Sequence, residues 1–256
     1  MTVTPAQRFS DTAASYAATM APSLRPMAAE VVRRACLNPR ERVLDLGTGT
    51  GIAAAAACGE GREVTGVDAA PGMLDIARDE VSGVELREMD FGALTFDDGA
   101  FDVAIAAHSL LFATDPTTVL REWLRVTRPG GRLSLSVPGP DKVTPTAIYG
   151  AIYDRHGIDT SSRYPTQATL HAFAVDAGWI DVETDANPTT AIRLADEAAF
   201  RSWREIGSRA AATANFTPKQ HRALTDEMLA ATPREPDGTY VIPFGALYLT
   251  ARRPNA

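Results

Sequence analysis

The feature that most constrains the fold is an apolar segment that runs directly into a turn with three glycines. Val43–Leu46 has the length of a buried strand, and Gly47, Gly49 and Gly51 follow at every second position before a helical stretch begins. Glycine lacks a Cβ, so the backbone can turn sharply and let a ligand approach its N–H groups, while the helix N-terminus offers unpaired donors to an anionic group. The segment predicts a nucleotide-like ligand. The simpler alternative, a tight turn without chemistry, is not excluded by a short glycine motif alone.

Strand-length apolar segments alternate with helix-length amphipathic stretches from Arg42 onward, which predicts parallel strands joined by crossover helices. Several strands are nearly continuous in apolar residues, as expected of strands that are covered on both faces. Pro71 and Asp115-Pro116 mark helix starts, and Pro129-Gly130-Gly131 marks a helix end. The expected strands are Val43–Leu46, Glu63–Val67, Val84–Met89, Phe101–Ala107 and Arg132–Val137.

The pattern changes at the breaker cluster Pro138-Gly139-Pro140, after which helical stretches dominate. We expect helices over Pro145–Arg155, Gln167–Ala177, Asp196–Ala211 and Pro218–Ala231, and two last strands, Asp181–Asp185 and Tyr240–Ala251, that close the sheet. The predicted fold class is therefore α/β: a Rossmann-like, seven-stranded, mostly parallel sheet with helices on both faces and an added helical lid.

Composition narrows the function classes. The 256 residues carry a net charge of −7, which disfavours binding to a nucleic-acid backbone. The longest apolar run, Ile52–Cys58, is far shorter than the roughly 20 residues of a membrane-spanning helix, and Met1–Ser10 lacks the apolar core of a secretory signal. Cys36 and Cys58 do not have the spacing of a zinc site or a disulfide framework. We therefore expect a cytoplasmic protein without a metal, a nucleic-acid partner or a membrane contact.

An acidic residue completes the nucleotide pattern. Asp68 ends the second expected strand 17 positions after Gly51, where a doubly wound unit places the carboxylate that binds a ribose diol. It could also serve only as the N-cap of the helix near Pro71. At the end of the third strand, Asp90 and Phe91 offer polar groups beside an aromatic ring for an adenine base. Met73 could pack on the same purine, although core packing is equally compatible with it.

These residues resemble the class I S-adenosylmethionine-dependent methyltransferases, and among them the ubiquinone/menaquinone-biosynthesis-like (type 11) group. The resemblance runs from about Phe9 to Pro254 and is carried by Leu44–Gly51, Gly66-Val67-Asp68, Phe101-Asp102-Val103 and Arg128–Leu133. It implies S-adenosylmethionine as the cofactor. By this resemblance Gly47, Thr48, Gly49, Thr50 and Gly51 hold the methionine end, Asp68 binds the ribose, Asp90 and Phe91 reach the adenine, Tyr16 folds over the cofactor, and Ala107 contributes only its backbone.

The resemblance also implies three segments within one structural domain. Residues 1–40 form a helical cap over the cofactor, residues 41–138 form the cofactor-binding core, and residues 139–256 complete the sheet and add helices that form the acceptor pocket. Possible acceptor-wall side chains are Tyr149, Tyr153, Arg155, Arg193, Phe200 and Trp203, although the three-residue spacing of the last two is more typical of packing.

Two other classes share parts of this pattern. A nicotinamide-dependent oxidoreductase has a similar strand, glycine turn and acidic residue, but it usually has a longer glycine spacing, and no Tyr-x-x-x-Lys pair occurs here. A protein that binds S-adenosylmethionine for a different reaction, such as a cyclisation, would carry the same motifs, because cofactor motifs do not define the chemistry.

Methyl transfer from a sulfonium needs alignment more than a nucleophilic residue, and a general base helps only if the acceptor loses a proton. His108 follows the fourth strand at the edge where open α/β sheets bind ligands, so we name it as the candidate base. A structural histidine is the alternative. An apolar lid would suit a small-molecule acceptor. Whether oxygen, carbon or nitrogen receives the methyl group stays open, as does the oligomeric state.

Overall fold

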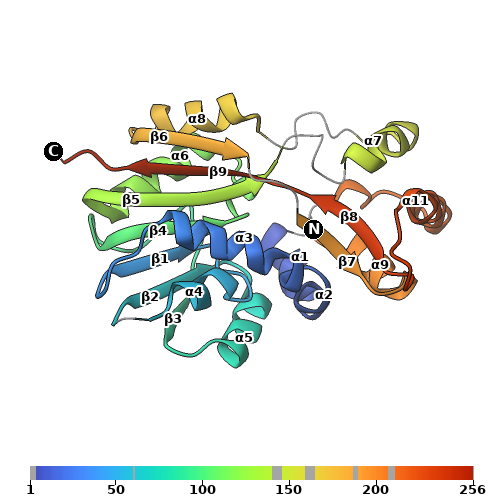
Figure 1. The fold of residues 1–256 in the computed structure, drawn as a ribbon, viewed down its shortest axis with the longest axis horizontal. Helices are drawn as coiled ribbons and strands as arrows, with labels where there is room; N and C mark the ends of the chain where they lie inside the picture. The colour runs from blue at the N-terminus through green and yellow to red at the C-terminus, as the bar shows by residue number, and fades with distance from the viewer. Residues whose placement is uncertain are drawn as a thin grey trace.

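The fold is described by a computed structural model over residues 4–59, 61–139, 146–158, 165–186, 190–206 and 211–255. The main sheet consists of β1 (Arg42–Leu46), β2 (Glu63–Asp68), β3 (Val84–Glu88), β4 (Phe101–Ala107), β5 (Thr127–Pro138), β6 (Ile180–Ala186) and β9 (Ala246–Arg252). Its order is β3-β2-β1-β4-β5-β9-β6 (Figure 1). The first five strands are parallel, and β9 runs antiparallel to both β5 and β6. The predicted seven-stranded, mostly parallel sheet is confirmed.

Helices cover both faces of this sheet because its strands bury side chains on both sides. Val43 packs with α3 (Ala21–Arg34) and α4 (Ile52–Ala57) in one apolar cluster. Leu44 packs on the other face, where the second cluster includes side chains of α6 (Pro116–Val126) and α8 (Gln167–Asp176). Trp123 of α6 is fully buried there. Burying a large apolar side chain contributes roughly 1.5–3 kcal/mol, so these two layers hold the sheet in place.

The strand order reverses between β1 and β4. The chain passes from β1 outward to β2 and β3, and then returns to place β4 on the other side of β1. Ligands of open α/β sheets bind in the crevice outside the carboxyl ends of the strands at such a reversal. Gly47, after β1, and His108, after β4, both lie at this edge.

The segment Tyr240–Ala251 was predicted as one strand, and this prediction is wrong. The chain forms two strands, β8 (Tyr240–Phe244) and β9, separated by Gly245. Only β9 joins the main sheet, whereas β8 pairs with β7 (Thr190–Leu194) in a second, two-stranded sheet. The run of apolar residues continues on both sides of Gly245, so hydrophobicity alone does not mark the break. The sequence analysis did not predict β7.

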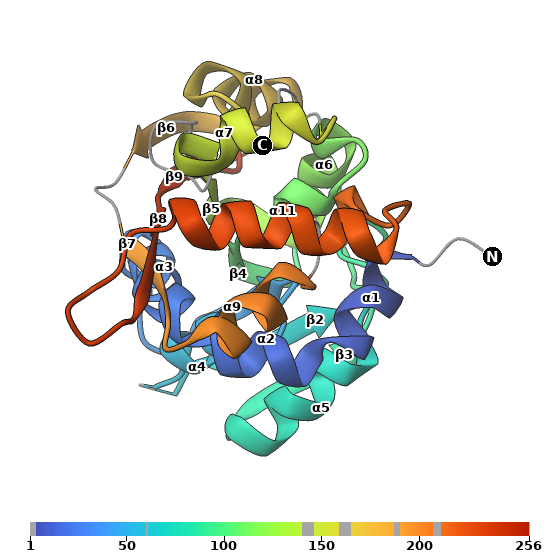
Figure 2. The same cartoon turned by 90° about the vertical axis from the view of Figure 1, so that its right-hand side faces the viewer.

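Three further helices lie beyond the carboxyl edge of the sheet: α7 (Thr146–Arg155), α9 (Glu197–Arg204) and α11 (Pro218–Ala231). Figure 2 looks onto this end of the molecule. Aromatic contacts connect α7 with α9 and α9 with β8: the Tyr149 ring lies 6.4 Å from Trp203, and Phe200 lies 5.3 Å from Tyr240. The Tyr149 hydroxyl lies 2.7 Å from the hydroxyl of Thr232, at the end of α11. The predicted helix over residues 196–211 ends earlier, at Arg204, and residues 207–210 lie outside the described chain, as does the expected helix start at residue 145.

The N-terminal segment forms α1 (Pro5–Asp11), α2 (Ala13–Thr19) and α3. The first two helices lie at the carboxyl edge of the sheet, near α5 (Pro71–Glu80), whereas α3 packs on the sheet beside α4 (Figures 1 and 2). The amide of Gly72 in α5 donates a hydrogen bond to the Ser10 hydroxyl, 3.1 Å away. A Cβ at Gly72 would lie 2.6 Å from the Ser10 carbonyl oxygen, so glycine permits this close contact. Within the described residues, no helix is long and apolar enough to span a bilayer.

Candidate active site

The glycine turn uses its three glycines in different ways. Each has a positive φ, between 56° and 80°, which favours glycine. A Cβ at Gly47 would lie 2.4 Å from the Cβ of Ser109, so this glycine lets the loop after β4 approach. Gly49 has no atom within 4 Å of its Cβ position, so this point of the turn faces open space.

Gly51 is predicted to contact the cofactor, and the structure shows in addition a packing constraint at this glycine. A Cβ there would lie 2.8 Å from Val81, and Gly51 lines neither of the two cavities described below. It occupies the N-cap position of α4 in a left-handed conformation. Gly51 thereby lets the start of α4 pack against the end of α5. The regular spacing of the motif does not distinguish this glycine from Gly47 and Gly49.

Asp68 is fixed by the backbone that surrounds it. Its carboxylate accepts hydrogen bonds from the amides of Gly49, at 2.8 Å, and Ala70, at 2.9 Å. Burial raises the pKa of Asp68, while these amide hydrogen bonds oppose the rise. The carboxylate thus links the glycine turn to the start of α5. Each oxygen retains a lone pair for a further donor, so the turn role and a ribose role are compatible.

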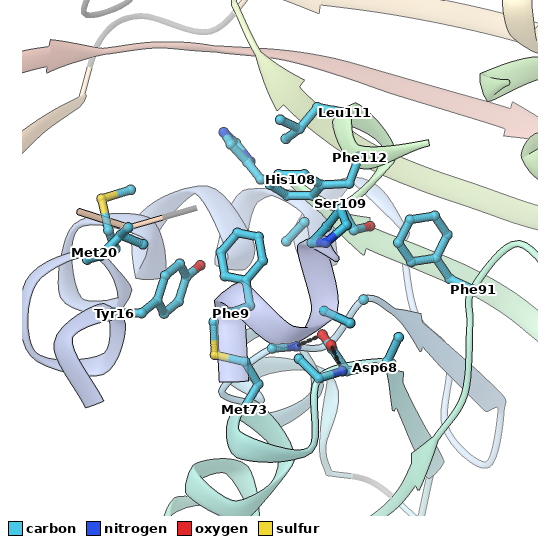
Figure 3. A pocket seen from close by; sticks show the side chains of 18 of the residues that line it. Phe9, Tyr16, Met20, Asp68, Met73, Phe91, His108, Ser109, Leu111 and Phe112 are labelled. Carbon is cyan, nitrogen blue, oxygen red and sulfur yellow. Dashed lines mark hydrogen bonds between the residues drawn. The ribbon is translucent and has the colours of Figure 1, made fainter. Parts of the chain in front are cut away.

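A cavity of about 450 Å³ lies at this edge of the sheet, which is within the range of small-molecule sites. In Figure 3, Asp68 and Met73 lie at one end of the view and His108 at the other. The cavity brings together nine of the residues that the sequence predicted: Tyr16, Gly47, Gly49, Asp68, Met73, Asp90, Phe91, Ala107 and His108. Thr48 and Thr50 line a smaller adjoining cavity instead.

The smaller cavity contains a carboxylate that the sequence analysis did not assign to the site. Asp45 is fully buried, and its Oδ2 accepts a hydrogen bond from the Thr48 hydroxyl at 2.7 Å. Burial raises the pKa of Asp45 to about 7. Its Oδ1 and the Thr50 hydroxyl have no hydrogen-bond partner among the described residues. The signal was a charged residue within the otherwise apolar strand Val43–Leu46.

Unpaired buried polar atoms indicate what the site can hold. A buried group without a partner destabilises the fold, so a ligand that supplies the missing hydrogen bonds is favoured. Asp45 would suit a cationic amine, and the open space beside Gly49 leaves room for the rest of such a ligand. These preferences fit the methionine end of S-adenosylmethionine, which carries an ammonium and a carboxylate.

His108 is held in an unusual position. Its φ is +60°, a left-handed conformation that is costly for a residue with a Cβ. Its amide donates to the Ser136 carbonyl at 3.0 Å, and its ring Nδ1 lies 2.7 Å from the Ser136 hydroxyl oxygen. Burial lowers the pKa of His108 to about 4. The imidazole is therefore neutral at physiological pH.

Apolar side chains that the sequence analysis missed form much of the cavity wall. Phe9 of α1 contacts Tyr16 and Phe112 edge to face, with ring centroids 6.1 Å and 5.0 Å away. Met20, Leu111, Ile206 and Phe244 complete the wall. None of the proposed wall residues Tyr149, Tyr153, Arg155, Arg193, Phe200 and Trp203 lines either cavity, and Phe200 and Trp203 are buried as packing residues.

The described residues contain no group of three or more histidine, cysteine or acidic side chains arranged to hold a metal ion. The site instead combines an acidic nucleotide end with an apolar end. This division suits a cofactor with a polar ribose and methionine, and a second, largely apolar molecule beside it.

Comparison with known proteins gives the class. The profile of the family described as methyltransferase domain matches residues 44–135. The demethylmenaquinone methyltransferase of Renibacterium salmoninarum is 31% identical over 162 residues, which are 56% of this chain and 68% of that protein. That of Clavibacter sepedonicus is 40% identical over 96 residues, which are 36% of this chain and only 39% of that protein.

Solved structures show the same fold. The YcgJ protein of Bacillus subtilis superposes with a TM-score of 0.60 at 17% identity, covering 91% of this chain and 99% of that one. Phosphoethanolamine N-methyltransferase 2 of Haemonchus contortus, solved with S-adenosylhomocysteine, has a TM-score of 0.56 at 18% identity, covering 90% and 52%. The [4+2]-cyclase SpnF has a TM-score of 0.55 at 23% identity, covering 91% and 81%.

The fold and the site together define a Rossmann-like, S-adenosylmethionine-dependent enzyme. The chain belongs to the class I S-adenosylmethionine-dependent methyltransferases, in the ubiquinone/menaquinone-biosynthesis-like group. The alternative of a nicotinamide-dependent oxidoreductase is therefore not retained. The structural likeness to a cyclase concerns the fold alone.

Proposed function

We propose that the protein transfers a methyl group from S-adenosylmethionine to a small organic molecule. The observation that carries this proposal is the single cavity that joins Asp68 and the glycine turn to an apolar end near His108, at the strand-order reversal. The cavity is enclosed by Phe9, Tyr16 and Phe112, which leaves room for a small molecule rather than a folded protein. The relatives named as demethylmenaquinone methyltransferases act on molecules of this size class.

The cofactor residues have separate roles in this proposal. Asp68 would hold the ribose hydroxyls, Asp90 and Phe91 the adenine, and Gly47, Gly49, Thr48 and Thr50 the methionine end, with Tyr16 and Met73 packing over the cofactor and Ala107 contributing its backbone. When bound, the sulfonium supplies an activated methyl group. The chain contributes alignment and exclusion of water, which together can lower the barrier by roughly 7–11 kcal/mol in favourable cases.

His108 is the proposed side chain next to the acceptor. The sequence analysis named it as a general base, and its place in the cavity wall keeps it in reach of a bound molecule. A histidine with a pKa of about 4 is a weak base near neutral pH, because the best catalytic bases titrate close to the working pH. We propose that His108 contacts the acceptor. Which ring nitrogen carries the proton decides whether His108 accepts or donates a hydrogen bond there.

A calorimetric titration tests the cofactor. We expect S-adenosylmethionine and S-adenosylhomocysteine to bind saturably and NAD and NADP not to bind. Asp68→Ala should weaken binding by about 10-fold to 100-fold, as expected for loss of hydrogen bonds to a charged group. Asp68→Asn keeps the size of the side chain and removes its charge. Comparing it with Asp68→Ala distinguishes an effect of the lost charge from an effect of a collapsed glycine turn.

Asp75→Ala is the matched control, because Asp75 lies on the same helix α5 with its side chain 73% exposed. It should bind the cofactor like the parent protein. Binding of only a nicotinamide cofactor, or equal binding by the Asp68 and Asp75 variants, would overturn the proposed site. If the cofactor binds, acceptor screening for S-adenosylhomocysteine release then tests methyl transfer itself.

We also propose a cytoplasmic location. Cys36 and Cys58 are both free thiols in the structure, and unpaired cysteines are typical of a reducing compartment. The net charge of −7 continues to disfavour nucleic acid as the acceptor.

A further inference from the structure

Two contacts hold the ring of His108, and a third holds its backbone. Its backbone amide and its Nδ1 both contact Ser136 of β5, at 3.0 Å and 2.7 Å. Its ring stacks at 5.4 Å and 30° on Phe244 of the second sheet. The left-handed φ of His108 is maintained by these contacts, as strained conformations are when the surroundings over-determine them. The side chain is therefore presented in one orientation.

The other ring nitrogen has no partner. Nε2 is buried and makes no hydrogen bond within the described part of the chain. Nε2 itself is buried, but the His108 residue lines both cavities, so a molecule in the larger cavity is the candidate partner for this nitrogen. Asp45, Asp68 and Asp90 also line these cavities, and none is hydrogen-bonded to the ring.

The contact with Ser136 determines which nitrogen carries the proton. The Ser136 hydroxyl has one recorded side-chain partner, the Nδ1 of His108. If the hydroxyl donates to Nδ1, only the Nε2–H is left unpaired. If Nδ1–H donates instead, both the hydroxyl hydrogen and the Nε2 lone pair are buried without partners. The first arrangement leaves one buried polar group without a partner and the second leaves two, so the first arrangement is favoured.

We propose that Ser136 holds His108 as the Nε2–H tautomer, and that His108 donates a hydrogen bond to an oxygen of the acceptor rather than removing its proton. The part of this proposal that concerns the acceptor rests on the proposed methyl transfer. The acceptor class is an apolar molecule whose ionised enolate, phenolate or carboxylate oxygen lies at or beside the methylated atom. Ser136 is then a positioning residue that acts through His108.

The chemistry balances without a base. The acceptor supplies the electron pair of the new bond to the methyl carbon, and the pair of the broken carbon–sulfur bond stays on sulfur. An acceptor that is already ionised has no proton to lose in this step. The Nε2–H hydrogen bond keeps such an oxygen in place in an otherwise apolar wall formed by Phe9, Leu111 and Phe244.

The tautomer can be measured without any substrate. Two-bond ¹H–¹⁵N spectra of the uniformly labelled full chain distinguish the two neutral forms of each of its four histidines. His108→Gln assigns the signal. We expect the Nε2–H form from pH 6 to 8, with the preference lost in Ser136→Ala. His171→Gln is a control that should leave the His108 signal unchanged. An Nδ1–H form, or a His108 ring that titrates near pH 6.5, overturns the proposal.

A pair of probes tests the acceptor class. Acetophenone and α-methylstyrene have nearly the same shape, and only the first has a carbonyl oxygen. With S-adenosylhomocysteine bound, the ketone should shift the Nε2–H resonance and bind about fivefold tighter, as expected for one net hydrogen bond. His108→Phe should remove this difference.

Equal binding of the two probes, or no shift with either at millimolar concentration, overturns the assignment of the acceptor oxygen. The outcomes also separate this proposal from the proposed function. A chain that binds S-adenosylmethionine and methylates an acceptor, but shows the Nδ1–H tautomer, retains the function and loses the inference. A chain that shows the Nε2–H tautomer but binds no S-adenosylmethionine retains the inference about Ser136 and loses the function.

Discussion

Two carboxylates of the cofactor site differ in what surrounds them. Asp68 accepts two backbone hydrogen bonds, whereas Asp45 has one recorded side-chain partner, Thr48, and an Oδ1 without a partner. For Asp45, burial outweighs the hydrogen bonds from Thr48 and the Ala54 amide, so the protonated form is favoured. The pKa of Asp45, raised by burial to about 7, therefore places its titration in the physiological range.

This pKa predicts a trade-off between stability and cofactor binding. The ordinary pKa of 3.8 describes Asp45 in the unfolded chain, so the folded protein binds more protons between about pH 4 and pH 7. The free energy of unfolding should therefore fall as the pH rises through this window, by an amount on the order of a few kcal/mol. Asp45→Asn should remove this slope and be more stable than the parent protein at pH 8. Urea unfolding at pH 5 and pH 8 measures it.

The same substitution should weaken S-adenosylmethionine binding at pH 8, because the ionised carboxylate is the form that attracts a cationic amine. The parent protein should bind more tightly at pH 8 than at pH 6, and Asp45→Asn should bind equally at both. If the variant binds as well as the parent at pH 8, Asp45 does not face the cofactor.

At the scale of elements, α9 contains a cation in an apolar layer. Arg204 is 4% exposed, burial lowers its pKa, and its Nε has no hydrogen-bond partner in the described chain. Burial of a charged guanidinium with an unpaired Nε is costly, although the charge of nearby Glu205 offsets part of this cost. Arg204→Met should therefore raise the free energy of unfolding, by about 1–2 kcal/mol.

Arg201 of the same helix provides the control. It is exposed and forms ion pairs with Glu197 and Asp226, so Arg201→Met should change stability by less than about 1 kcal/mol. Thermal and urea unfolding of both variants measure the difference. A loss of stability in Arg204→Met would show that the guanidinium is compensated within the fold.

The elements also show which parts of the fold the sequence could predict. The strands before residue 138 were predicted to within a residue or two, except that β5 begins five residues earlier than expected. The predictions succeeded because buried parallel strands carry continuous apolar runs and are separated by proline and glycine signals. The break at Gly245 was missed, since a run of apolar residues shows that both segments are buried and not which sheet each segment joins. The strand β7 is five residues long and pairs only with β8, so it had no independent signal.

At the scale of the whole molecule, the site depends on segments that are far apart in sequence. The glycine turn and Asp68 were predictable because their spacing is local. Phe9, Ile206 and Phe244 reach the cavity from α1, from the end of α9 and from β8, and no local pattern connects these positions. Asp45 was visible as a charge within an apolar strand, but its role required knowledge of the cavity.

The contact between Gly72 and Ser10 couples the N-terminal segment to the cofactor site. A Cβ at position 72 would lie 2.6 Å from the Ser10 carbonyl oxygen, so Gly72→Ala should displace α1 and with it Phe9. Alanine favours the helix itself by up to about 1 kcal/mol, so α5 should remain folded. We expect S-adenosylhomocysteine binding to weaken by about tenfold, measured by calorimetry.

A double-mutant cycle separates this coupling from local damage. Deletion of residues 1–11 should weaken binding by a similar factor, and the deletion combined with Gly72→Ala should add little. Fully additive losses would show that Gly72 acts on the cofactor independently of α1.

The position of β9 has a consequence for synthesis of the chain. Because β9 lies between β5 and β6, the earlier strands leave a gap in the sheet that only residues 246–252 can fill. While these residues remain inside the ribosome, β5 and β6 each present an unpaired edge, which is a template for association with other chains. A nascent protein of this kind is therefore exposed to aggregation until residues 246–252 have left the ribosome and filled the gap, and a chaperone would protect it most before that point.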